Sequence, residues 1–379
     1  MLPDSACFWI VVAYAGAAIG DRCFVDWAPK PIFPNFPLMV VMPSGWGKTG
    51  AMNTARPLFD NCLPYRIPED CTAESAVRAF AQNARSRFSN SVCIWEIPEL
   101  ADVFGRKDYQ QGLIARVTRL LDAPKDREAF RVTGNVQFRI QGHAVMTWVA
   151  GTTMEWLSQH VEDAVSSGGF LPRLINLYEE ANPKWIPNPQ RDETQIRTLN
   201  SELYQLLNAD TSPVSIAVPL PDWWEEVSQK TYEDLVASKD TLATPFIARR
   251  QENILRIWLI FTKLGSVSKW NTVGEMTQSF DIRSTCLNCA QWLENQSVKL
   301  SEDLIVRQNP LFERVLGIVE RRQNGVKFSE IIRLVRGMTA FQLSNVLRDL
   351  VDRGLIKWNG LKGDHGIAKP VIRDKQEEE

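Results

Sequence analysis

The sequence predicts an α/β domain with a mainly parallel sheet, then an α-helical lobe, then a small C-terminal domain of helices and a hairpin. Apolar, strand-like runs alternate with helical stretches over residues 1–181, which is the order that produces a parallel sheet flanked by helices. Helical patterns dominate residues 182–305, and short helices precede two strand-like runs in residues 306–375.

The composition narrows the class of protein. A chain of 379 residues has the length of two or three domains, and 44% hydrophobic with 23% charged residues is typical of a globular protein. The net charge of -2 gives no whole-chain attraction to nucleic acid, so any such attraction must come from local patches. Seven scattered cysteines favour reduced thiols and a cytoplasmic protein.

The apolar run at residues 6–19 could be mistaken for a signal peptide. No lysine or arginine precedes it, Asp4 does, and the run is too short to cross a bilayer. We therefore expect a buried helix and no membrane segment.

A glycine-rich loop follows the first strong strand. Residues 28–37 are proline-rich, residues 38–42 form an apolar strand, and a helix is expected over residues 48–59. A loop between strand and helix is the setting of a phosphate-binding loop, in which backbone amides and the helix N-terminus cradle phosphate. The residues expected to do so are Ser44, Gly45, Trp46, Gly47, Lys48, Thr49 and Gly50. The fold class is therefore an α/β P-loop NTPase core.

The closing residues of the loop indicate the cofactors. Lys48 is placed to reach the outer phosphates and the Thr49 hydroxyl to bind Mg²⁺, so ATP and Mg²⁺ are expected. Met42 stands where the full pattern has its first glycine.

ATP hydrolysis also requires a carboxylate at a neighbouring strand end, to hold the metal's waters or polarise the attacking water. The strand at residues 91–95 ends at Glu96, and Glu99 lies one turn further on. Glu96 is the first choice for the metal or water role and Glu99 the second. The adjacent Asp-Glu pair often found here is absent, and a surface carboxylate beside a strand is the simpler alternative.

Two further residues are candidates for catalysis. Thr152, or Thr153, ends the strand at residues 145–150 and is placed to contact the γ-phosphate or the water, although capping of the next helix is an alternative. Arg173 closes Gly168-Gly-Phe-Leu-Pro-Arg173, and an arginine after a glycine pair suits a finger acting on a neighbouring subunit. An ordinary surface arginine is the alternative.

The middle of the chain reads as helical. A hairpin is expected around Gly134-Asn135, a proline-broken linker at residues 182–190, and four helices beyond it over residues 195–208, 222–238, 245–264 and 273–296. Cys286 and Cys289 have the spacing of metal ligands, but no second ligand pair lies near them. Two small buried residues one helical turn apart are the simpler interpretation.

The last domain has the outline of a winged helix-turn-helix. A helix over residues 311–322 is followed by a second capped by Ser329 and a third capped by Thr339, and two strands then flank a glycine-rich tip. Residues 310–375 contain 13 basic and 7 acidic residues, and an acidic tail occupies residues 376–379. The third helix is expected to enter a DNA groove, with Lys357 and Lys362 on phosphates. Winged helices also bind proteins.

Several of these segments resemble an uncharacterised family of phage- and plasmid-borne P-loop ATPases, described as helicase or primase–helicase proteins. The resemblance covers about residues 5–295 and is carried by the loop with its strand, Gly151-Thr-Thr-Met-Glu-Trp-Leu157, the Arg173 segment and the helix from residue 245. It implies a RecA-like or AAA-like motor core, in a ring of identical subunits, acting on DNA. Arg249 matches a basic position on the family's lid helix. No primase-like segment is present.

The predicted function is an Mg-ATP-dependent, helicase-like DNA motor acting in replication of a phage or mobile element. It would bind single-stranded DNA in the core and duplex DNA at the winged helix. One alternative is an ATP-switched assembly protein, such as a loader, partition protein or transposition regulator, that does not unwind DNA. Another is a transcription regulator with a degenerate ATPase core.

Overall fold

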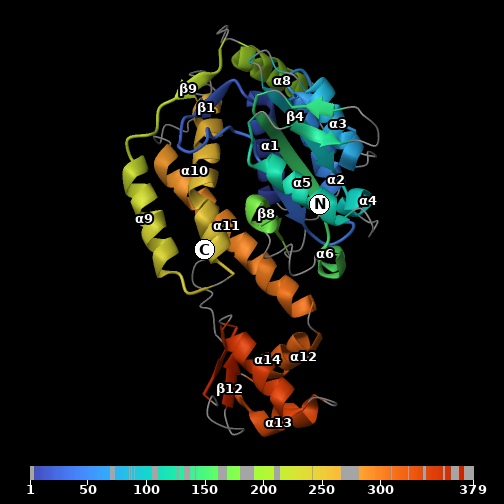
Figure 1. Ribbon diagram of the computed structural model, residues 1–379, viewed down its shortest axis with the longest axis vertical. Coiled ribbons are helices and arrows are strands. Elements are labelled where there is room, and N and C mark those ends of the chain that lie inside the picture. The colour runs from blue at the N-terminus through green and yellow to red at the C-terminus, as the bar shows by residue number, and fades with distance from the viewer. Residues whose placement is uncertain are drawn as a thin grey trace. The chain divides into compact units, whose positions relative to one another are not determined.

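The fold is given by a computed structural model of the whole chain (Figure 1). The residues that it describes are 4–68, 73–84, 86, 88, 90–104, 110–125, 128–131, 137–140, 142–160, 169–179, 192–208, 214–240, 242–265, 281–308, 310–322, 324–335, 339–352, 355–359 and 367–370. Outside them lie the Gly134-Asn135 turn, the linker at residues 182–190, Gly168, Lys362 and the acidic tail.

The chain divides into two compact units. The first comprises residues 1–236 and 245–297, and the second comprises residues 237–244 and 298–379. The boundary predicted at residue 182 does not separate these units, because the helices expected to form a lobe share a core with the sheet.

A five-stranded parallel sheet forms the centre of the first unit, as predicted. Its strands lie in the order β3-β4-β7-β2-β8 and every pairing is parallel. The four strands other than β3 are buried along their whole length, which explains their continuous apolar sequences. The strands are β2 (Leu38–Val41), β3 (Tyr65–Ile67), β4 (Ser91–Ile97), β7 (Ala144–Thr152) and β8 (Ile175–Tyr178).

Helices cover both faces of this sheet. On one face, α1 and α2 share a core with Ile94 and Val149. On the other, Trp95 and Trp148 pack edge to face, and Trp148 also contacts Phe104 and Phe170. The helical segments of this region are α1 (Asp4–Ile19), α2 (Lys48–Ala55), the 3-10 turn η1 (Arg56–Leu58), α3 (Ala73–Asn83), α4 (Leu100–Phe104), α5 (Gln110–Leu121), α6 (Met154–His160) and the 3-10 turn η3 (Leu171–Arg173).

The helix expected at the N-terminus is α1, and it is buried over nearly its whole length. It comes so close to the chain before β2 that a Cβ on Gly16 would lie 2.3 Å from the Pro34 carbonyl oxygen. Among the described residues, no helix is both long and apolar enough to cross a membrane. The apolar run therefore belongs to the core.

The remaining elements of the first unit continue this core. Ile254 and Leu255 of α10 and Leu293 of α11 pack in the same cluster as α1. A short strand, β9, pairs in parallel with β1. This pairing was not predicted, because each strand has only three residues. These elements are β1 (Cys23–Val25), the antiparallel pair β5 (Glu128–Arg131) and β6 (Gln137–Arg139), α8 (Glu193–Asn208), β9 (Ile216–Val218), α9 (Trp224–Ala237), α10 (Thr244–Gly265) and α11 (Ile282–Gln308), whose residues from 298 on belong to the second unit.

The second unit contains the predicted helices and hairpin. Helices α12 (Pro310–Glu320), α13 (Phe328–Leu334) and α14 (Ala340–Asp352) pack with an antiparallel sheet of order β10-β12-β11 around Val315, Leu347 and Ile356. The strands are β10 (Val326–Lys327), β11 (Ile356–Trp358) and β12 (Ile367–Pro370). The two-residue strand β10 was not predicted.

The two predicted helix caps in this unit have different outcomes. Thr339 accepts a bond from the Gln342 amide at 3.2 Å, and Gln342 accepts one from the Thr339 amide at 2.9 Å. This capping box confirms the prediction. Ser329 is not a cap, because α13 begins one residue earlier at Phe328, after Lys327.

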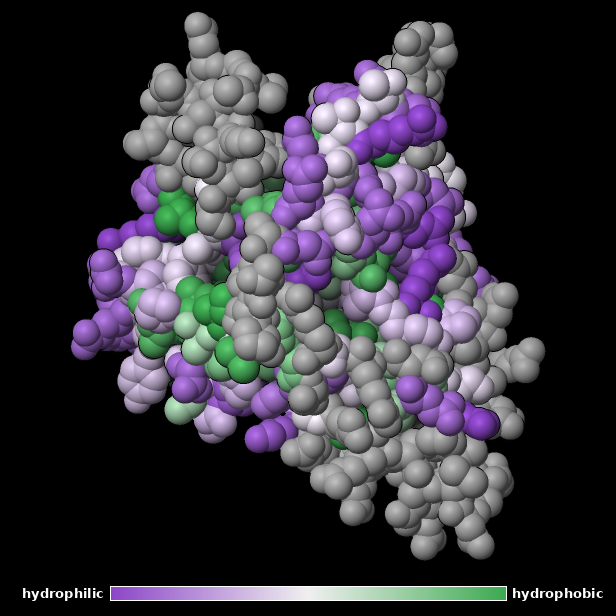
Figure 2. All heavy atoms as spheres, turned by 90° about the horizontal axis from the view of Figure 1, so that it is seen from above, coloured by the Kyte–Doolittle hydropathy of each residue, from purple (hydrophilic) through white to green (hydrophobic). Residues whose placement is uncertain are grey.

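Figure 2 shows the surface from above, turned by 90° from the view of Figure 1. Hydrophilic residues cover much of its coloured area, and hydrophobic residues occupy smaller areas between them. Single apolar side chains on a polar surface are ordinary and require no partner.

Cys286 and Cys289 lie one turn apart on α11, the first buried and the second half-buried. Burial raises the pKa of Cys286 to about 12. No group of three or more His, Cys, Asp or Glu side chains that could hold a metal ion is found in the described part of the chain.

Candidate functional site: a glycine loop at the carboxyl edge of the sheet

The glycine loop connects β2 to α2, and its backbone requires glycine at two positions. Gly45 has φ 80° and Gly47 has φ 86°, both in the left-handed region. Gly47 is also the residue from which α2 begins. A side chain at either position would strain this backbone, so both glycines are explained by conformation.

Lys48 places its amine inside the loop. Its side chain is buried, and Nζ donates to the carbonyl oxygens of Met42 at 3.0 Å and Pro43 at 3.2 Å. Burial lowers the pKa of Lys48, while the nearby charges of Glu99 and Glu155 act in the opposite direction. The loop thus encloses a cation that the protein only partly compensates.

Met42 departs from the usual loop pattern, and the structure accounts for it. The Met42 side chain is buried in the core, and its amide donates to the Thr152 carbonyl at 3.1 Å. Unlike Gly45 and Gly47, Met42 does not have a positive φ. Met42 therefore extends β2 by one residue, in a conformation that needs no glycine.

The other loop residues leave donors and space on the outer side. Ser44, Gly47, Thr49 and Gly50 are exposed, and Trp46 is half-buried against the core. Among the described residues no side chain caps α2, so the amides of its first turn have no cap to satisfy them. Unsatisfied amides at a helix N-terminus favour an anion.

Thr152 lies at the same level of the sheet as the start of the loop. It pairs with Val41 of the adjacent strand β2, and its Oγ1 is buried with no hydrogen-bond partner among the described residues. Gly151 beside it has no room for a side chain: an added Cβ would lie 2.3 Å from the Pro98 carbonyl oxygen and 3.5 Å from Cδ of Lys48. The ends of β7 and β4 and the Lys48 stem thus meet at one point.

The two candidate glutamates lie at different depths. Ile97 pairs with Ala150 and Glu96 with Val149, so Glu96 lies level with Leu38, at the beginning of β2. Pro98, just after the end of β4, lies against Gly151, and the Glu99 charge is close enough to Lys48 to act on its pKa. Glu99 is half-buried. The structure thus brings Glu99 and the end of β7, where Thr152 lies, near Lys48.

Glu96 has partners of its own below that edge. Only 3% of its side chain is exposed, and Oε2 lies 2.6 Å from Nη2 of Arg66 and 3.4 Å from Nη1 of Arg56. Burial and the Glu96 charge also raise the pKa of Tyr14 on α1. Glu96 is therefore a buried carboxylate that links α1, η1, β3 and β4 through partly exposed arginines.

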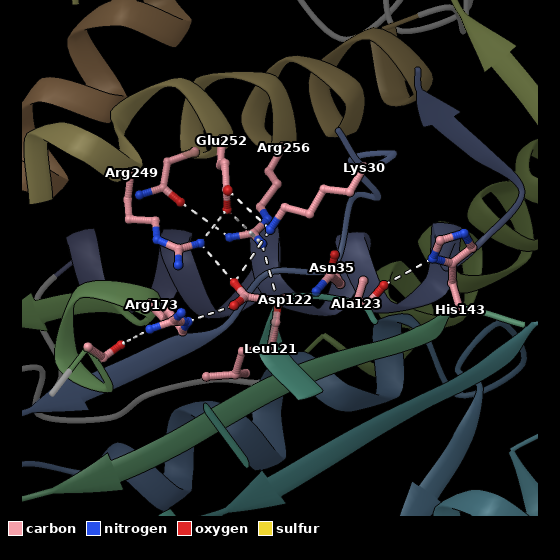
Figure 3. Close-up of polar contacts among 12 residues, drawn as sticks. Lys30, Asn35, Leu121, Asp122, Ala123, His143, Arg173, Arg249, Glu252 and Arg256 are labelled. Carbon is pink, nitrogen blue, oxygen red and sulfur yellow. Dashed lines mark hydrogen bonds and ion pairs between the residues drawn. The ribbon is translucent and has the colours of Figure 1, made fainter. Parts of the chain in front are cut away.

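Arg173 and Arg249 lie together, but at the opposite edge of the sheet. Arg173 precedes β8, whose first residue, Ile175, bonds to the chain just before β2. Nε of Arg173 and Nη1 of Arg249 each lie 2.8 Å from the carboxylate of Asp122 (Figure 3). Four residues of strand, about 10 Å, separate this edge from the loop.

Asp122 is the centre of a charged cluster. Burial alone would raise the pKa of Asp122, but the charges of Arg249 and Lys30 and the bond from Arg173 hold it at about 2. Its carboxylate is therefore ionised throughout the physiological range. This cluster could not be predicted from the sequence, because its members come from four separate segments.

Comparisons with known proteins give little more. No family model and no curated protein matches the chain. Among solved structures it is similar to an active helicase, Cch of SCCmec type IV, with a TM-score of 0.40 and 11% identity over 97% of this chain and 70% of that one. A likeness at this level assigns neither fold nor function.

Proposed function

We propose that this chain is an ATPase whose glycine loop binds the phosphates of Mg-ATP. The observation that carries the proposal is the position of Lys48, whose buried amine lies within 3.2 Å of two loop carbonyl oxygens. Carbonyl oxygens are weak partners for an ammonium group, and phosphate oxygens, being charged, bind it more strongly. The two left-handed glycines and the open helix N-terminus beside it suit the same ligand.

The surrounding residues suit hydrolysis. Thr49, exposed in the first turn of α2, would hold Mg²⁺, which neutralises charge on the phosphates when bound. We assign the task of orienting the attacking water to Glu99, a choice supported by the effect of its charge on the pKa of Lys48. Thr152 would donate from its hydroxyl, which has no partner in the described part of the chain. Glu96, the first choice from sequence, fits a structural role better because both arginines occupy it.

The larger assignment is a helicase-like, oligomeric DNA motor of a phage or mobile element. Its support in the second unit is α14, where Asn345 and Arg348 are exposed three residues apart and so share a face. Asparagine and arginine are side chains that read adenine and guanine in the major groove. Lys357 and Lys369 are exposed on the neighbouring strands. We propose that this unit is a winged helix that binds duplex DNA.

The ATPase proposal is tested by turnover of purified protein with Mg-ATP, with and without single-stranded DNA. Lys48→Ala should lower turnover about 100-fold or more, because it removes the positive charge that stabilises the phosphate during transfer. Lys230→Ala, at an exposed lysine of α9, is the matched control and should leave turnover unchanged. Turnover that persists in Lys48→Ala would refute the site, and an inactive wild type would refute the enzyme.

The motor proposal needs a separate assay. A partial duplex should be separated in the presence of ATP, and Arg348→Ala should weaken duplex binding without lowering DNA-free turnover. Assembly on duplex without strand separation would favour the alternative, an ATP-switched loader, partition or transposition protein. Tight, sequence-specific duplex binding that ignores ATP would favour a transcription regulator.

A further inference from the structure

We propose that the cluster around Asp122 is a second phosphate-binding site, separate from the loop. It goes beyond the ATPase function and does not depend on it. Its ligand is a terminal phosphate, either free or at the end of a nucleotide.

The cluster carries an excess of positive charge. Four cations, Lys30, Arg173, Arg249 and Arg256, surround two carboxylates, Asp122 and Glu252. Both carboxylates are held ionised, because burial alone would raise their pKa values and the neighbouring cations lower them instead. Two positive charges therefore remain uncompensated among these groups, and a phosphate dianion would match them.

Several hydrogen-bond donors in the cluster are not used. Arg249 bonds through Nη1 and Arg173 through Nε and Nη1, leaving Nη2 of each without a partner in the described part of the chain. Arg256 is more telling: only 6% of its side chain is exposed, and its buried Nε has no partner among the described residues. A buried, unpartnered guanidinium nitrogen is costly, and the Arg256 charge adds to the positive excess that a nearby anion would balance.

The donors are held in place and remain open to solvent. Figure 3 shows Arg249, Glu252 and Arg256 pointing from α10 toward Asp122, with Arg173 and Lys30 approaching from other segments. The side chains of Lys30, Arg173 and Arg249 are 20–28% exposed, so an ion can reach them. Their contacts with Asp122 fix the guanidinium groups before a ligand arrives, which lowers the entropy lost on binding.

A terminal phosphate fits this cluster better than a DNA backbone. A guanidinium group can bind two phosphate oxygens at once, and three guanidinium groups converge here. DNA carries a single charge on each phosphate and requires an extended basic surface. The cationic side chains here all gather around one carboxylate pair instead.

The experiment uses the full chain with Lys48→Ala, which removes the lysine of the loop and makes ATP turnover irrelevant. Inorganic phosphate, pyrophosphate and ATP are titrated by calorimetry. We expect saturable binding with one site per chain. In this background, Arg249→Gln and Arg173→Gln should each weaken binding about 10-fold or more, since each removes a charged hydrogen bond. Lys30→Gln, in a loop and less able to disturb folding, should weaken it less.

The matched control is Arg250→Gln on the same helix. Nε and Nη2 of Arg250 are paired with Glu294 and Nη1 with Asp234, so it offers nothing to a ligand. Phosphate affinity should not change in this variant, provided that thermal unfolding shows it folded.

The outcomes are distinct. Stronger binding of ATP than of phosphate identifies a nucleotide tail as the source, and equal binding identifies the free ion; both support the site. The proposal is overturned if phosphate shows no saturable binding. It is also overturned if every cluster variant binds phosphate as tightly as the Lys48→Ala parent does. Loss of oligonucleotide binding in Arg249→Gln, with no binding of phosphate or pyrophosphate, also overturns it, because the ligand would then be DNA.

Discussion

The two edges of the central sheet present positive charge in different ways. At the carboxyl edge, one lysine is enclosed by a loop whose own backbone supplies the remaining donors. At the amino edge, four cationic side chains are arranged around two carboxylates. The loop geometry depends on local conformation, so a short motif encodes it. The cluster depends on tertiary packing, so no contiguous motif encodes it.

The largest effect on kcat is expected at the carboxyl edge, where Glu99 and Glu96 should respond differently to the same substitution. Glu99→Gln should lower kcat by about 100-fold or more, because the amide cannot accept a proton from water. Nucleotide affinity should hold within a few-fold. Measurements of kcat and of ATP binding under single-turnover conditions check this. If Glu99→Gln retains full turnover, the carboxylate at this edge is not the base.

Glu96→Gln should act mainly on stability. It removes the charge that pairs with Arg56 and Arg66, whose side chains are 28% and 38% exposed, and the loss of these charged hydrogen bonds costs about 2 kcal/mol. Denaturant unfolding should show that loss, while kcat per folded molecule stays near the wild-type value. A loss of kcat greater than that of Glu99→Gln, with stability unchanged, would reverse the two assignments.

At the amino edge, Asp122 should make stability depend on acid. Its pKa is about 2 in the folded chain and 3.8 ordinarily, so it stabilises the fold above pH 3.8 and loses that effect as pH falls toward 2. The contribution is about 2 kcal/mol. Asp122→Asn should lose it at neutral pH and unfold less steeply with acid between pH 4 and 2. Asp102→Asn, at an exposed position on α4, should follow the wild type.

The smallest effect is expected for Gly47→Ala. Its φ of 86° strains any side chain, which costs about 1 kcal/mol of stability. Gly50→Ala is the control, because no atom of the described residues lies within 4 Å of the added Cβ. Thermal unfolding compares the two, and an equal change in both would show that backbone strain is not the reason for Gly47.

Much of the carboxyl edge could be predicted because it follows from local rules. Short apolar runs in the sequence predict the buried strands β2 and β7. The glycine loop with Lys48 follows the first of these strands, and Thr152 ends the second. The choice between Glu96 and Glu99 could not be made, since it depends on the register of β4 against β7 and on arginines from η1 and β3. Arg173 and Arg249 were singled out separately, but their common partner Asp122 follows a helix end with no distinguishing pattern.

Gly151 has a consequence for motion as well as for packing. The missing side chain at this position leaves room for the Pro98 carbonyl and the Lys48 stem, which both lie close to Gly151. If Lys48 leaves its carbonyl partners for a phosphate, its stem moves beside Gly151, against which the residue before Glu99 lies. Binding of a nucleotide would then be felt locally by the carboxylate that we propose as the water-orienting group, with no moving domain required.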